Sequence, residues 1–120
     1  MATAISRQDA LIETLRSIIQ VINSLGSTAF KNPNMRNALT NKINAVFQML
    51  EQEDYSNALD KLENDILKKT DGCAQTGAPD NNDWILNCVS QGQVHPVLMN
   101  AIKLLRSMIW LSCGNKVYLK

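Results

Sequence analysis

Residues 32–69 read NPNMRNALTNKINAVFQMLEQEDYSNALDKLENDILKK and predict two amphipathic helices in succession. In the first, apolar side chains recur every three or four residues and share one helical face: Met35, Leu39, Ile43, Val46 and Leu50. Asn32 followed by Pro33 is typical of a helix start, because asparagine caps well and proline fits the first helical position. The pattern therefore predicts a helix over residues 33–52.

The second helix of this stretch is predicted over residues 55–70, with Asp54 or Ser56 as its cap. Its expected inward face consists of Tyr55, Leu59, Leu62 and Ile66. Acidic residues crowd its start and Lys68 and Lys69 close it, which complements the helix dipole. Because the connection between the two helices is very short, they should form an antiparallel hairpin.

Two further helices flank this hairpin. The earlier one, over residues 6–25, begins with the capping pair Ser6 and Asp9 and ends before Gly26. Its apolar stripe is Leu11, Leu15, Ile18, Ile22 and Leu25. The later one, over residues 96–113, should open at Pro96, with this apolar face: Val97, Leu98, Ala101, Ile102, Leu105, Met108 and Ile109.

The expected architecture is an all-α, four-helix bundle that occupies residues 1–120 as a single domain. A chain of 120 residues can bury an adequate core, and with 45% hydrophobic but only 5% aromatic residues that core should be aliphatic. Residues 71–95, between the third and fourth helices, carry glycines, a proline and a polar run, and therefore predict an irregular loop. One helical turn is expected within it, through residues 84–86.

Cys73 and Cys88 bracket this loop, and Cys113 is the third cysteine of the chain. A bond between the first two would order a segment without helical packing and stabilise it by about 3 kcal/mol. The disulfide is the favoured interpretation and implies an oxidising compartment; reduced thiols packed against apolar neighbours are the alternative. Cys113 is either a buried thiol or an exposed one that joins two chains.

Residues suited to catalysis are scarce. His95 is the sole histidine, and a structural role at a helix start is expected for it. The glycines match no phosphate-binding loop, and carboxylate pairs such as Asp60 with Glu63 lie on exposed helical faces. The sequence therefore predicts a protein that is not an enzyme and that requires no cofactor.

The polar run of the loop offers oxygen ligands that calcium prefers: Asp71, Asp80, Asn81, Asn82 and Asp83. The regular calcium-loop alternation fails, however, because Trp84 and Leu86 occupy positions where ligands are needed. Turn-forming aspartate and asparagine are thus the expected interpretation, and an irregular calcium site is the alternative.

The net charge of +1 predicts no strong attraction to nucleic acid. Beyond Asp83 the chain has no acid, and four spread cations are expected to be solvated: Lys103, Arg106, Lys116 and Lys120. No apolar run is long enough to span a bilayer, and the beginning of the chain does not resemble a signal peptide.

The hairpin contains the motifs NPNMRNAL at 32–39, KINA at 42–45, YSNAL at 55–59 and LENDI at 62–66. On these residues it resembles the FIMAH-like helical modules of bacterial secreted and surface proteins. The segment from KTDGC at 69–73 through NDWI at 82–85 to Cys88 looks like a two-cysteine-loop variant. The resemblance implies an extracytoplasmic, non-catalytic accessory module, and it transfers no site residues.

Two functions follow as hypotheses. The first is an accessory, interaction or spacer module of an exported protein, which contacts other domains of a parent chain or a protein partner. The second is a cytoplasmic helical adaptor or self-associating bundle, including a homodimer. In that case the last helix would supply the contact face, through Trp110, Leu111 and Cys113.

Overall fold

The computed structural model describes residues 7–118, with side chains over residues 8–110, and this part of the chain is almost wholly helical. The first half holds α1 (Arg7–Ser24), the short 3₁₀ helix η1 (Ser27–Ala29) and α2 (Met35–Glu51). The second half holds α3 (Tyr55–Lys61), η2 (Leu62–Ile66), η3 (Leu67–Lys69), α4 (Gly72–Thr76) and α5 (Cys88–Tyr118). Within the described residues the β-structure is one isolated antiparallel bridge, between Phe30 and Ile85. The predicted all-α class is confirmed.

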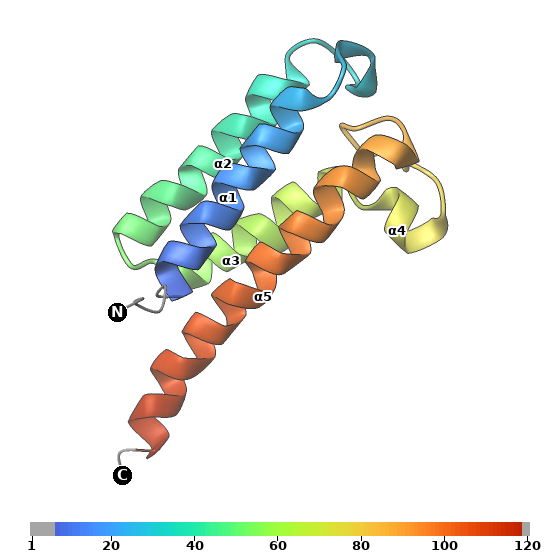
Figure 1. The fold of residues 1–120 in the computed structure, drawn as a ribbon. Helices are drawn as coiled ribbons and strands as arrows, with labels where there is room; N and C mark the ends of the chain where they lie inside the picture. Colours follow the sequence, from blue (N-terminus) through green and yellow to red (C-terminus); the bar gives the residue numbers. More distant parts are fainter. Residues whose placement is uncertain (1–6, 119–120) are drawn as a thin grey trace, which may run out of the picture.

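The long helices pack around one apolar core. α1 lies against α2 and α5, and α3 lies against α2 and α5, as Figure 1 shows. The buried apolar side chains, almost all aliphatic, are Leu11, Leu15, Ile18, Ile22, Leu25, Ala29, Phe30, Leu39, Ile43, Val46, Leu50, Ala58, Leu62, Ile66, Ile85, Val94, Leu98, Ala101, Ile102 and Leu105. The predicted stripe of the first helix is buried throughout.

The hairpin of α2 and α3 forms as predicted, with local differences. Asn32 accepts a bond from the Asn34 backbone N–H (2.9 Å), so a turn precedes α2 and the helix starts at Met35. On the next helix Ala58 is fully buried whereas Tyr55 and Leu59 are only partly so.

The predicted helix over residues 55–70 is continuous but changes its winding. After α3 the chain forms one π-helical segment, η2, and then the 3₁₀ turn η3. A π segment widens the helix and rotates the residues that follow it, which hydrophobic periodicity does not report. Asp65, which contacts α2, lies inside this segment.

The predicted start of the last helix at Pro96 is wrong, because α5 begins eight residues earlier, at Cys88. Asn87 caps it: its Oδ1 accepts the N–H of Ser90 (2.7 Å), and its carbonyl accepts the N–H of Gln91 (3.0 Å). Pro96 therefore lies inside the helix, where it lacks the N–H that would bond the carbonyl of Gly92. Capping and the packing of buried Val94 outweigh that loss.

The segment predicted as a loop, 71–95, is consequently shorter, since α4 and the first turns of α5 occupy both of its ends. The helical turn predicted at residues 84–86 is also wrong. There the chain is extended, and Ile85 pairs with Phe30 while the N–H of Leu86 bonds the carbonyl of Ala29 (2.7 Å). Side chains alternate along extended backbone, so Asp83 and Ile85 are buried and Trp84 faces the other way.

α5 extends beyond its neighbours. Its 31 residues correspond to about 46 Å of helix, against about 27 Å for the 18 residues of α1. Figure 1 shows its C-terminal end projecting past α1, α2 and α3. None of the helices in the described part of the chain combines the length and apolar character that a bilayer crossing requires.

Candidate functional site

A disulfide joins α4 to α5. It links Cys73 to Cys88, the first residue of α5, with their Cα atoms 5.5 Å apart. The pair predicted from the sequence is therefore the pair that the structure contains. The bond closes the irregular segment 77–87 at both ends, and Cys88 lies at the surface whereas Cys73 is half-buried.

Beneath the disulfide lies a buried carboxylate, Asp83, which is only 1% exposed. Its Oδ2 accepts hydrogen bonds from the backbone N–H of Asp80 (2.8 Å) and of Gly72 (3.1 Å), and from Nε2 of Gln91 (2.9 Å). A buried carboxylate is stable only when donors replace its lost hydration. Asp83 therefore organises the loop through three N–H groups from three separate segments.

Gln91 completes this arrangement from the first turn of α5 and is equally buried. Its Nε2 also donates to the carbonyl of Ile85 (2.7 Å), and its Oε1 accepts the N–H of Cys73 (3.0 Å). One amide side chain of α5 thus links α4 to the last part of the loop. We call Asp83, Gln91 and the groups they bond the polar cluster.

Three of the acids considered as calcium ligands do come together. Carboxylate oxygens of Asp71, Asp80 and Asp83 lie within 4.8 Å of one another. However, Oδ1 of Asn82 accepts a bond from Lys69 (2.9 Å), and Oδ2 of Asp83 already accepts three N–H bonds. The hydrogen bonds of Asp83 explain the position of this one carboxylate, and both the turn-forming interpretation and the calcium alternative stay predictions.

Asp71 should make the protein less stable as the pH rises. Burial raises the pKa of its carboxyl above the ordinary 3.8, and the charges of Asp83 and Asp80 raise it further. The folded state thus binds the proton more tightly than the unfolded chain, so the contribution of Asp71 is most favourable below pH 3.8 and declines as the pH passes the folded-state pKa. Asp71→Asn should remove this decline.

The measurement is the free energy of unfolding from denaturant titrations between acidic and neutral pH, taken as the difference between wild type and Asp71→Asn. Asp60→Asn, on an exposed turn of α3, is the matched control for the loss of one charge. The raised pKa of Asp71 would be contradicted if the free energy of unfolding of Asp71→Asn did not increase relative to wild type as the pH rises.

His95 does not start a helix as predicted but lies inside α5, half-buried. It lines a groove of about 640 Å³ between α1 and α5, together with Thr14 and Ser17. The hydroxyl of Thr14 donates to the backbone carbonyl of Ala10 (2.8 Å), and the hydroxyl of Ser17 donates to the backbone carbonyl of Glu13 (3.1 Å). Both hydroxyls therefore bond their own helix backbone, an arrangement that does not activate a nucleophile.

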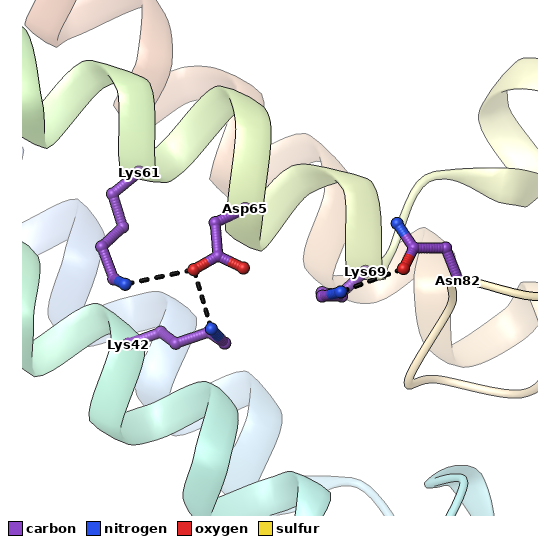
Figure 2. A network of polar contacts seen from close by, with 5 residues as sticks. All are labelled: Lys42, Lys61, Asp65, Lys69 and Asn82. Atoms are coloured by element: carbon purple, nitrogen blue, oxygen red, sulfur yellow. Dashed lines mark hydrogen bonds and ion pairs between the residues drawn. The ribbon is translucent and has the colours of Figure 1, made fainter.

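A second polar site faces away from the core, between α2 and the η2–η3 segment. Lys42 of α2 and Lys61 of α3 both contact Oδ2 of Asp65, at 2.7 and 3.1 Å. Further along, Lys69 bonds Asn82 of the loop, as Figure 2 shows. The ring of Trp84 lies near two of these cations, with its centroid 5.3 Å from Nζ of Lys42 and 5.2 Å from Nζ of Lys69.

Lys31 extends this row of cations, because its Nζ bonds the carbonyl of Asn81 (3.2 Å), next to Asn82. We call the set of Lys31, Lys42, Lys61, Lys69 and Trp84 the lysine face. Burial alone would raise the pKa of Asp65, but the hydrogen bonds and charges of Lys42 and Lys61 outweigh it and hold that pKa below its ordinary 3.8.

The proposed contact face on the last helix is described only in part. Trp110 is 59% exposed near the projecting end of α5. The side chains of Leu111 and Cys113 lie outside the described residues, as does Ser6, the predicted cap of the first helix.

Sequence reasoning did not single out Gln91 or the lysine face. A signal for the first exists, since Asn87 followed by Ser90 and Gln91 is a helix start that would have placed Gln91 beside Cys88. The lysine face has no local signal, because its members come from positions 31, 42, 61, 69 and 84 and meet only in the folded chain.

Comparison of the chain with protein-family models, with curated proteins and with solved structures gave no match.

Proposed function

We propose that this chain is a non-catalytic accessory module that works in an oxidising, extracytoplasmic compartment as an interaction or spacer unit of a larger exported bacterial protein. The observation that carries the proposal is the Cys73–Cys88 disulfide over the polar cluster. Disulfides persist where the environment is oxidising, and cytosolic reductants keep most thiols reduced. The resemblance of the hairpin to FIMAH-like modules supports the same assignment.

The proposed fold of the module is a four-helix bundle, in which η2 and η3 continue the third helix. In support, α1 packs on α2, α2 on α3, α3 on α5 and α5 on α1, which closes a ring of contacts around one core. Such a bundle holds its loop and its surface side chains in fixed positions, as an interaction or spacer unit requires.

A non-catalytic role is further supported by how the polar groups are used. The buried carboxylate and amide of the polar cluster are held by hydrogen bonds to each other, to α4 and to the loop. The hydroxyls of the groove beside His95 bond their own helix. Side chains committed in this way hold the fold together, and a catalytic group needs a free atom directed at a substrate.

The disulfide predicts a definite alkylation pattern. Protein refolded in a glutathione redox buffer and then denatured without reductant should take up one alkyl group per chain, at Cys113, and three after reduction. Reduction should also lower the free energy of unfolding by about 3 kcal/mol, because it releases a loop whose ends are 15 residues apart. Intact mass and denaturant titrations measure the two effects.

Cys113→Ser is the control, and it should abolish alkylation before reduction and leave the stability difference unchanged. Three alkyl groups without reductant would contradict the proposal. That result would support the alternative function, a cytoplasmic adaptor or self-associating bundle that uses the projecting end of α5 around Trp110 as its contact face.

A further inference from the structure

Three of the four lysines of the lysine face, Lys42, Lys61 and Lys69, are held in place before any ligand arrives, whereas Lys31 is exposed. The side chains of Lys42 and Lys61 are only 24% and 25% exposed, and Lys69 is also half-buried. Each ammonium has a defined partner: a carboxylate for Lys42 and Lys61, and an amide oxygen for Lys69. Long side chains that are already ordered lose little conformational entropy when they bind an anion.

Trp84 is fixed at the centre of this face by its own backbone. Its N–H donates to the carbonyl of Lys69 (2.7 Å), and its carbonyl accepts the N–H of Lys31 (2.9 Å). The neighbours Asp83 and Ile85 are buried, so alternation directs the indole outward, toward Lys42 and Lys69. The aromatic ring thus lies within reach of two cations and attracts each of them.

The positive charge of the lysine face exceeds the negative charge that it meets. Over residues 8–110, every ion pair made by its lysines goes to one carboxylate, that of Asp65. Lys69 and Lys31 contact neutral oxygens of Asn82 and Asn81. Within these residues Lys31 and Lys69 therefore form no ion pair with a carboxylate, although Asp80 and Asp83 lie on the same loop as Asn81 and Asn82.

We propose that the lysine face binds an oxyanion, such as a sulfate, phosphate or carboxylate group, beside Trp84 between Lys42 and Lys69. Asp65 is an internal example of such binding, because one oxygen of its carboxylate contacts the ammonium groups of both Lys42 and Lys61. A ligand oxyanion would exchange the neutral partner of Lys69 for a charged one, which adds an attraction between opposite charges to the hydrogen bond. The inference rests on the proposed function in that it names the ligand chemistry of the interaction module.

The test uses the intact chain with Trp110→Phe, so that fluorescence reports Trp84 alone, since the chain has two tryptophans. Sodium sulfate is titrated against sodium chloride at equal ionic strength, and polygalacturonate and dextran sulfate are titrated separately. Saturable quenching by sulfate indicates a free oxyanion as ligand. Quenching by the polymers alone indicates an oxyanion carried on a polysaccharide chain.

Variants assign the binding to these residues. Lys42→Met with Lys69→Met should weaken binding of the active probe about tenfold. Two changes of the same kind elsewhere, Lys103→Met and Lys116→Met on α5, are the control and should change it less than twofold. Asp65→Asn removes the competing carboxylate and should tighten binding about threefold.

Circular dichroism and thermal unfolding confirm that each variant is folded. The proposal is overturned if neither sulfate nor either polymer binds saturably, or if the two pairs of lysine variants behave alike. Because this readout does not involve the cysteines, it fails or succeeds independently of the alkylation test above.

Discussion

Replacing Gly72 with alanine should lower the free energy of unfolding by about 3 kcal/mol, because the polar cluster leaves no room for a side chain there. An added Cβ would lie 2.3 Å from Oδ2 of Asp83, 2.6 Å from the backbone N of Asp80 and 2.8 Å from the carbonyl oxygen of Ala78. Two of these three atoms belong to the backbone, and the third belongs to a buried carboxylate held by its own hydrogen bonds. None of them can move aside cheaply.

Gly92→Ala is the matched control, because an added Cβ there meets no atom within 4 Å. Gly92 lies in α5, where alanine is the better helix former, so this substitution should raise the free energy of unfolding by roughly 0.5 to 1 kcal/mol. Denaturant titrations followed by circular dichroism compare the two variants. Equal stabilities would show that residue 72 is not closely packed against Asp83.

Asp83→Ala should have the larger effect, a loss of about 4 kcal/mol. The change removes the acceptor of the N–H groups of Gly72 and Asp80 and of Nε2 of Gln91. These donors are held beneath the loop, and a buried donor without a partner costs about 1 to 3 kcal/mol. The amide protons of Gly72 and Asp80 should also exchange faster with solvent, which hydrogen exchange measured by NMR would detect.

Asp60→Ala is the control for this substitution. Its carboxylate bonds the exposed Nδ2 of Asn64 (2.7 Å), so removal should cost no more than about 0.5 kcal/mol. The loss for Asp83→Asn should lie between those for Asp83→Ala and Asp60→Ala. Asparagine keeps one acceptor oxygen, but its NH₂ group would face the N–H groups that the carboxylate now accepts. A loss for Asp83→Ala no greater than that for Asp60→Ala would contradict the role of the polar cluster.

The sequence by itself determined the helical class and the α2–α3 hairpin, and it favoured a bond between Cys73 and Cys88 over reduced thiols. The apolar residues of α1 and α2 repeat with the helical period, and that local regularity survives in the fold because burial of one face stabilises it. The disulfide followed from two cysteines that bracket a segment poor in apolar periodicity. Each of these inferences uses residues within one helix, one hairpin or one loop of the chain.

The tertiary structure decided what depends on residues far apart in the chain. Pro96 suggested a helix start, but the burial of Val94 in the core favoured a helix that begins eight residues earlier, at Cys88. The sequence suggested that Asp83 is a turn residue. Only the folded chain brings the N–H groups of Gly72 and Gln91 to its carboxylate, which is buried. Such contacts are set by three-dimensional packing, which hydrophobic periodicity does not encode.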